Sequence, residues 1–273
     1  MSGSRDMVTT RIWEEVAEPD NPFAAAACYC SGYDVYGDVL RHATLIDYLY
    51  LLFKQERPTP AQAKLLQGLA VALANAGPRD HSVQAAMCGG AGGSSAAASL
   101  MAALAVGAGN LGGGREVFTA MRLWETCGRQ LVLWRTHLTE PPEERADVWL
   151  PMEHPAGFDP HGVSCATPVR QTLAYLAECA VGDSLGWLRG QRTALEEIAG
   201  SPLAMTGVAA AALTDLGFSP AQGEMLYLLL RLPGAAVHAL EQNERGWRGY
   251  PFFADGLVLT DDPARADHEA VRD

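Results

Sequence analysis

The chain has 273 residues, of which 48% are hydrophobic and 19% are charged. This length and balance suit one large globular domain or two lobes, and they exclude a disordered chain and a disulfide-stabilised miniprotein. The formal net charge of -12 is the wrong sign for a nucleic-acid-binding protein, because such affinity comes largely from neutralised phosphates. An anionic small ligand would therefore be held by a few local arginines.

The six cysteines form no CxxC pair and have no zinc-binding spacing with histidine. We therefore expect reduced thiols in the core and no metal site. The first residues lack the apolar segment of a signal peptide, and the longest apolar stretch, around residues 96–108, is too short to span a bilayer. These features predict a cytoplasmic protein that does not cross a membrane.

Helix signals dominate the first part of the chain. In residues 45–53 the only charged residue is Asp47, which predicts a helix buried on nearly all sides. Residues 59–62, Thr-Pro-Ala-Gln, form a capping box with proline at the first helical position. The helix that they begin is expected to end at Gly77, because glycine followed by proline is a common stop.

The same signals return later in the chain. The Ala-rich segment 202–216 ends at Gly217, and residues 219–222, Ser-Pro-Ala-Gln, repeat the start signal before a long apolar helix. Pro233 is expected to kink or break that helix near its middle. Strand-like alternation is nearly absent, the best case being GLVLT at 256–260. The sequence therefore predicts an all-α fold with about ten or more helices.

Glycines gather in residues 88–93 and 107–114. The second cluster formally satisfies GxGxxG, but an Ala-rich run with helical character precedes it, where a dinucleotide site needs a strand. No Lys-Ser or Lys-Thr pair follows either cluster, which excludes a P-loop. From the glycines alone, close helix packing and a helix-ending turn are the simpler interpretation.

Five groups of motifs stand out in chain order. They are SGYDVYG and the two helical segments after it (31–62), Asp80-His81, GNLGGG (109–114), GFDPH with TPVR (157–161 and 167–170), and RLPGAAVHALEQ with WRGYPFF (231–242 and 247–253). Each group alone is a weak signal, but in this order they resemble the citrate synthase superfamily almost from end to end. Within that superfamily the chain is most similar to the citryl-CoA lyase branch and to the lyase module of ATP citrate lyase.

The resemblance implies a two-lobed all-α fold and chemistry on a CoA thioester. The reaction would make or break the carbon–carbon bond between an acetyl-type enolate and a 2-keto acid such as oxaloacetate. An enolate site needs a base for the α-proton, a donor on the thioester oxygen, a second donor on the ketone, and arginines for carboxylates. In the family, the aspartate of an NVD motif is the base, the histidine of an HGGA motif is the donor on the thioester oxygen, and the histidine of a GFGH motif is the donor on the ketone. No covalently bound cofactor is implied, since the CoA thioester is a substrate.

Two family catalytic positions are substituted in this chain. Gly112 aligns with the HGGA histidine, and Thr206 aligns with the NVD aspartate. Neither side chain can do the missing proton work. Loss of a general base alone typically costs about 10²- to 10⁴-fold in rate. Glu153, His154 and Asp159 are the candidates to replace the two lost catalytic groups.

His161 is the candidate catalytic residue, because it aligns with the ketone-donating histidine of the GFGH turn. Arg170 follows nine residues later and is expected to bind substrate. His154 is a rival for the same alignment, since EHP resembles a GHP variant of the motif. It lacks an arginine at a family-like offset, so both assignments stay open with His161 preferred.

Three further residues are expected to bind substrate. Arg231 lies in an apolar helix, where an arginine is expensive unless it is paired or faces a ligand. His81 matches the family's Asp-His pair, although a simple role as a helix cap is an equal alternative. Arg248, or Arg245 in its place, matches the family arginine that reaches into the neighbouring subunit.

The resemblance also implies a homodimer with a cleft between two lobes. The large domain would combine residues 1–115 and 219–273, and the small domain would be residues 116–218. His238 and Glu241 match a family motif and are expected to support packing at the dimer rather than chemistry. Closure of the cleft would exclude water from the reaction.

Two function classes remain open from the sequence. One is a citryl-CoA lyase-like or citrate synthase-like enzyme acting on an acyl-CoA and a 2-keto acid. The other is a catalytically silent homologue that binds a keto acid or CoA as a regulatory or partner subunit. A helical scaffold without a ligand finds no support in the retained histidines and arginines.

Overall fold

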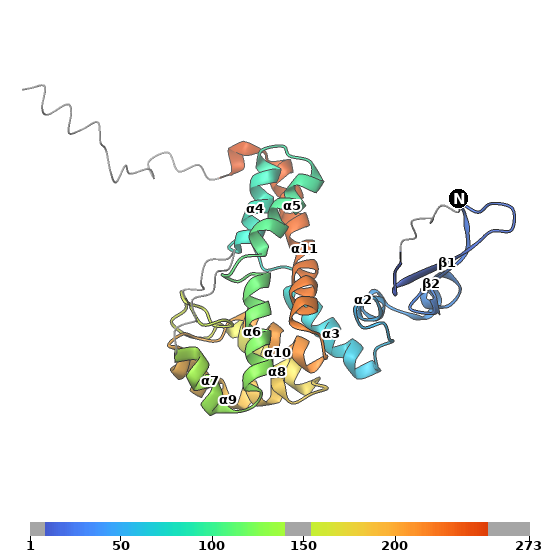
Figure 1. Ribbon diagram of the computed structural model, residues 1–273. Coiled ribbons are helices and arrows are strands. Elements are labelled where there is room, and N and C mark those ends of the chain that lie inside the picture. The colour runs from blue at the N-terminus through green and yellow to red at the C-terminus, as the bar shows by residue number, and fades with distance from the viewer. Residues whose placement is uncertain (1–8, 140–153, 251–273) are drawn as a thin grey trace, which may run out of the picture.

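The computed structural model describes residues 9–139 and 154–250, and it shows an all-α fold with one small sheet at its N-terminal end (Figure 1). The described chain contains eleven α-helices, as the sequence predicted. They are α1 (Leu40–His42), α2 (Leu45–Lys54), α3 (Pro60–Leu73), α4 (His81–Ala91), α5 (Ala96–Gly107), α6 (Gly114–Cys127), α7 (Leu131–Thr139), α8 (Thr167–Glu178), α9 (Ser184–Ala199), α10 (Met205–Asp215) and α11 (Pro220–Arg245). The expected strand at 256–260 lies outside the described residues.

The N-terminal residues form an arm that projects from the helical body (Figure 1). Its antiparallel sheet has the order β1 (Trp13–Ala17), β2 (Ala25–Cys30), β3 (Tyr33–Asp34), and a π-helical turn η1 (Val35–Val39) leads into α1. These strands were not predicted, because β1 is exposed along most of its length and β2 is built mainly of alanine and cysteine. Neither strand therefore shows alternating hydrophobicity.

The α2 helix also differs from its prediction. A capping box between Thr44 and Asp47 fixes its start, but only Tyr50 and Leu51 are fully buried, and Leu45 is exposed. The prediction of a helix buried on nearly all sides is therefore wrong. The reason is its place in the arm, where the rest of the protein covers only one face.

The centre of the body is α10, in which every residue from Thr206 to Leu213 is buried. Its alanines let α6, α8, α9 and α11 approach closely, and α3 also packs against it. Beside it, the rings of Trp124, Trp134 and Trp187 meet with centroids 5.0–6.1 Å apart. The predicted Ala-rich helix is thus confirmed, and it holds the core in which the candidate site is anchored.

The α11 helix runs for 26 residues through Pro233 without ending, so the expected break does not occur. Its start is the predicted capping box at Ser219 with Pro220 at the first helical position. Directly after the proline, the Gly234 N–H donates to the Ala74 carbonyl at 2.6 Å. A tertiary hydrogen bond to the end of α3 therefore satisfies a backbone group at the point where the proline disturbs the helix.

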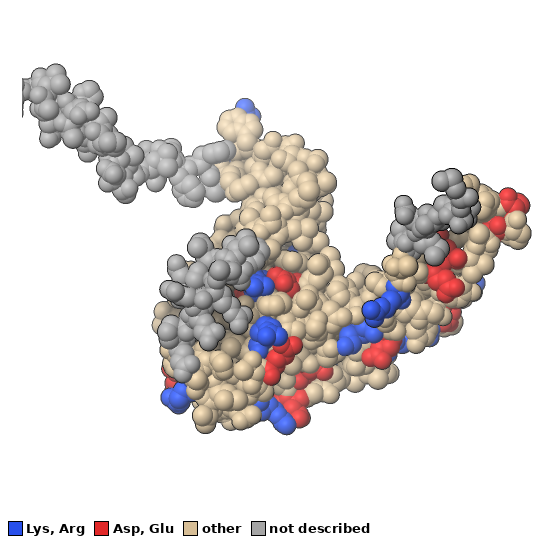
Figure 2. All heavy atoms as spheres, in the orientation of Figure 1, with Lys and Arg blue, Asp and Glu red and all other residues tan. Residues whose placement is uncertain are grey.

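One end of the body is formed by α4, α5 and the C-terminal half of α11. Residues 81–114 contain no Asp, Glu, Lys or Arg. On the face shown in Figure 2, this end is nearly free of charged side chains, whereas acidic and basic side chains are interspersed over the lower body and the arm. The small residues of α4 allow its backbone to lie close to α11.

All six cysteines are free. Four are buried and Cys179 is half-buried, but Cys88 is exposed, so the expectation of core positions fails for that one thiol. Burial raises the pKa of the Cys127 and Cys165 thiols. In the described ranges, no group of three His, Cys, Asp or Glu side chains could hold a metal ion, and no helix is long and apolar enough to cross a membrane. The division into domains at residues 115 and 218 stays a prediction.

Gly90 in α4 and Gly190 in α9 test the close approach of α4 to α11. A Cβ at Gly90 would overlap the Ala239 carbonyl oxygen, whereas a Cβ at Gly190 would meet no atom within 4 Å. We expect Gly90→Ala to lower the free energy of unfolding by about 1–3 kcal/mol through overpacking. Gly190→Ala should raise it by about 0.5–1 kcal/mol, since alanine is the better helix former. Chemical denaturation measures both, and equal effects of the two changes would contradict the close contact.

Candidate active site

A cleft of about 570 Å³ is lined by the end of α3, the segment that leads into α4, the start of α10 and the middle of α11. The turn before α6 and the loop around residues 157–168 complete its wall. Of the seven residues expected to be catalytic, to bind substrate or to occupy substituted catalytic positions, it brings together five, namely His81, Gly112, His161, Thr206 and Arg231. Of the three candidate replacements, Asp159 lines the cleft, His154 does not line it, and Glu153 lies outside the described residues.

Arg231 enters the cleft wall from α11 and is nearly buried, with 6% of its surface exposed. Its Nη2 donates to the Asp80 carboxylate, its Nη1 donates to the Gly112 carbonyl at 2.8 Å, and its guanidinium lies over the Tyr227 ring. Asp80 in turn caps α4 by accepting from the Ser82 and Val83 N–H groups. Arg231 is therefore both paired and turned to the cleft, which are the two conditions that the sequence set for it.

Asp80, and not His81, is the N-cap of α4. His81 is the first residue of that helix, it is exposed, and it lines the cleft. The structure thus removes the capping alternative for His81. Its imidazole is left available to a ligand in the cleft.

Gly112 lies in a turn with φ of +66°, which favours glycine, and a Cβ there would meet no atom within 4 Å. Both its backbone N–H and its carbonyl form hydrogen bonds. Its carbonyl accepts from Arg231 and from the Tyr227 hydroxyl, the latter at 3.0 Å, and its N–H donates to Glu116 at 2.6 Å. Burial is the main cause that raises the pKa of Tyr227, so its hydroxyl stays protonated and remains a donor.

Glu116 is the residue of the cleft that the sequence did not reveal. It is 1% exposed, and its Oε1 accepts from the Gly157 N–H at 2.9 Å and from the Thr206 hydroxyl at 2.7 Å. Its Oε2 accepts from Gly112 and lies 3.7 Å from His154 Nε2. In the sequence it is simply an acid in the first turn of a helix, which is a common surface feature.

The two histidines that competed for one role lie in different surroundings. His161 is exposed and lines the cleft, and its backbone N–H donates to Asp159 Oδ1 at 2.9 Å. The loop is anchored by the Asp159 N–H, which donates to the Pro202 carbonyl. His154 lies behind Glu116 with its side chain 8% exposed, and its Nε2 has no hydrogen-bond partner. His161 is therefore the one placed to contact a ligand directly.

Arg170 and Arg248 do not line this cleft. Arg170 donates to the Thr167 hydroxyl at 2.9 Å and lines a separate pocket of about 450 Å³. The Arg248 guanidinium lies over the Trp247 ring at 5.1 Å. Their expected roles in substrate binding stay predictions. Two neighbours in the same motif, Arg245 and Glu241, form an ion pair at 2.6 Å.

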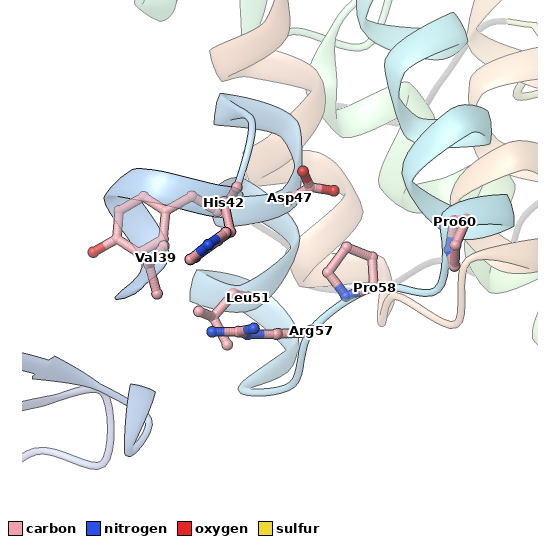
Figure 3. Close-up of a pocket in the computed structure, with 9 residues that line it drawn as sticks. Val39, His42, Asp47, Leu51, Arg57, Pro58 and Pro60 are labelled. Carbon is pink, nitrogen blue, oxygen red and sulfur yellow. The ribbon is translucent and has the colours of Figure 1, made fainter. Parts of the chain in front are cut away.

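Another cavity, of about 330 Å³, lies in the arm (Figure 3). Three of its polar side chains already have partners outside its lining, since Arg57 and His42 both contact the Asp38 carboxylate and Asp47 forms the capping box of α2 with Thr44. None of the residues expected to do chemistry lines it. The cleft beside α10 is therefore the better candidate site.

Comparison with solved structures identifies the fold. The chain is similar to the citryl-CoA lyase of Hydrogenobacter thermophilus, with a TM-score of 0.73 and 17% identity over 94% of this chain and 96% of that one. It is also similar to ATP citrate lyase of Methanothrix soehngenii in complex with citrate and coenzyme A, with a TM-score of 0.74 and 16% identity over 97% of this chain and 43% of that one. For a mutant ATP citrate lyase of Methanosaeta concilii in complex with (3S)-citryl-CoA, the TM-score is 0.73 at 15% identity, over 98% and 44% of the two chains.

The chain therefore has the fold of citryl-CoA lyase, and the expected citrate synthase-like architecture is confirmed. It spans nearly all of the Hydrogenobacter enzyme and less than half of the two ATP citrate lyases. Its sequence matches no model of a protein family and no curated protein. The likeness that these comparisons show thus lies in the fold.

The Arg231–Asp80 pair yields a stability prediction. Arg231→Ala would remove the cation that pairs with the largely buried Asp80 carboxylate and one of the two donors to the Gly112 carbonyl. We expect the free energy of unfolding to fall by about 3 kcal/mol, the lower end of the range for breaking a buried pair, because Asp80 keeps some exposure. The exposed Arg170→Ala should change it by less than about 0.5 kcal/mol. Denaturant titration decides the matter, and similar losses in both variants would count against the pair.

Proposed function

We propose that this chain cleaves the carbon–carbon bond of a citryl-CoA-type thioester to give an acyl-CoA and a 2-keto acid such as oxaloacetate. The observation that carries the proposal is the match over nearly the whole length of both chains to a protein named citryl-CoA lyase. The complexes of its other neighbours with citrate, coenzyme A and (3S)-citryl-CoA support the same substrate class. The proposal covers carbon–carbon bond cleavage alone, and the thioester is retained in the acyl-CoA product.

The chemistry asks little beyond proton transfer and charge stabilisation. The hydroxyl of the substrate loses its proton and becomes the ketone as the adjacent carbon–carbon bond breaks. The electron pair passes to the thioester as an enolate, which then takes a proton at carbon. No oxidant, reductant or bound cofactor enters this balance, and CoA is part of the substrate.

The cleft residues suit these tasks. His161 is proposed to hydrogen-bond the substrate hydroxyl and to stabilise the charge that develops as the ketone forms. Arg231 has five N–H donors, and those not used by Asp80 and Gly112 can bind a substrate carboxylate. His81 at the start of α4 is a second proposed carboxylate partner. Arg170 and Arg248 would join only if the acyl-CoA arm or a second subunit extends the site.

We also propose that the protein acts as a homodimer in the cytoplasm. The end of the body formed by α4, α5 and the C-terminal half of α11 supports the dimer, because Met101, Val106, Val237 and Leu240 are exposed there and a second copy could cover them. The free cysteines support a reducing compartment.

The function can be tested by supplying (3S)-citryl-CoA and measuring the release of acetyl-CoA and oxaloacetate. We expect cleavage by the native protein and a fall in kcat of about 10²-fold or more for His161→Ala, with KM changed much less, because the histidine acts on charge in the transition state. His137→Ala is the matched control, since His137 is exposed on α7 and does not line the cleft. Substrate binding without cleavage would reject the lyase and favour a silent homologue.

The dimer can be tested by sedimentation. A dimer is expected at micromolar concentration, and Val237→Glu should shift it toward the monomer because a charge would be buried in an apolar interface. Val132→Glu on α7 is the matched control, as Val132 is also exposed, on another part of the body. A native protein that sediments as a monomer would contradict the proposed assembly.

A further inference from the structure

The proposed reaction leaves one requirement unassigned, namely a group that delivers a proton to the enolate carbon. The buried acid Glu116 is not used by that scheme, although it lines the same cleft. Its 1% exposure is the lowest among the buried polar and charged residues of the described chain. A carboxyl group so deeply buried is expensive unless its partners compensate it, so its position calls for a specific role.

The three donors to Glu116 are not equivalent. Gly112 and Gly157 donate backbone N–H groups, which fix the carboxylate but cannot relay a proton. Thr206 donates a hydroxyl, which can give one proton while it accepts another. Thr206 also lines the cleft. Its hydroxyl is therefore a two-way link between the buried acid and a ligand.

A buried base lies behind the acid. His154 Nε2 is 3.7 Å from Glu116 Oε2 and has no hydrogen-bond partner, and its side chain is more than nine-tenths buried. An imidazole at this distance can share a proton with the carboxyl group after a small movement. The order His154, Glu116, Thr206 thus leads from the interior to the cleft.

We propose that Thr206 is the catalytic proton donor of the cleft, and that Glu116, with His154 behind it, is the positioning residue that supplies the proton. This inference rests on the proposed function. In the structure the Thr206 hydroxyl donates to Glu116 Oε1 at 2.7 Å. The relay requires this bond to reverse when Glu116 carries a proton, so that the carboxyl group donates to Thr206 Oγ1 and the threonine hydroxyl is free to point into the cleft. Glu116 thus supplies Thr206 with a proton, which a threonine side chain on its own could not replace after giving up its hydroxyl proton.

The step is balanced. As the carbon–carbon bond breaks, the substrate hydroxyl gives its proton to His161. The enolate carbon then takes the Thr206 hydroxyl proton, while the Thr206 oxygen takes the proton of Glu116. After the products leave, His161 releases its proton to water and Glu116 regains one, so no net proton is consumed.

The test uses two readouts on the full chain. The first is cleavage of (3S)-citryl-CoA. The second is exchange of the acetyl-CoA methyl protons for deuterium in D₂O with malate present, since malate can fill a dicarboxylate site but has no ketone to condense. The exchange reports proton transfer at carbon without any carbon–carbon chemistry.

Thr206→Val and Thr206→Ser are the matched pair, because they differ in the hydroxyl while leaving Glu116 in place. We expect Thr206→Val to lower both kcat and the exchange rate at least about hundredfold, with KM changed less than about threefold. Thr206→Ser should retain both within about tenfold. Glu116→Gln should match Thr206→Val if it folds, and the threonine pair decides the question if it does not.

The outcomes separate this inference from the proposed function. Cleavage and exchange that persist in Thr206→Val would overturn the relay and leave the lyase standing. Exchange without citryl-CoA cleavage in the native protein, lost in Thr206→Val, would reject the lyase and support the relay. A native protein that shows neither reaction would overturn both.

Discussion

The carboxylate of Glu116 is the constraint on which the candidate site depends. It joins three segments that are far apart in the chain, namely the turn at Gly112, the loop at Gly157 and the start of α10 at Thr206. Loss of any one of these three donors would leave a buried acceptor unsatisfied, which costs free energy. These three hydrogen bonds therefore hold three segments of the cleft wall in place relative to one another.

The Gly112 peptide extends this constraint across the cleft. Its N–H points to the Glu116 carboxyl group and its carbonyl to the cationic Arg231, which is itself held by the cap of α4 at Asp80. The positive charge of Arg231 thus lies at the negative end of this peptide dipole, which is the favourable direction. Because the same network ends on the cap of α4 and on α10, a change at Arg231 is expected to alter both the free energy of unfolding and the geometry of the cleft.

The sequence predicted correctly those features of the fold that depend on residues close to one another in the chain. The capping boxes at Thr59 and Ser219 and the Ala-rich helix could be found because their partners lie within four residues. The continuity of α11 through Pro233 depends on a carbonyl from α3, which no nearby sequence encodes. Glu116 was missed for the same reason, since its partners Gly157 and Thr206 lie 41 and 90 residues away. Arg231 was found because its cost in an apolar helix is itself a local signal.

The two substitutions that the sequence presents as separate losses are coupled in the structure. Gly112 and Thr206 both donate to Glu116, one through its backbone and the other through its side chain. The positive φ at Gly112 aims its N–H at the acid, and a residue with a Cβ would adopt that angle only with strain. A glycine at this turn and a hydroxyl at the start of α10 are thus conditions for one buried carboxyl group. The site is better understood as a set built around Glu116 than as a family site with two residues removed.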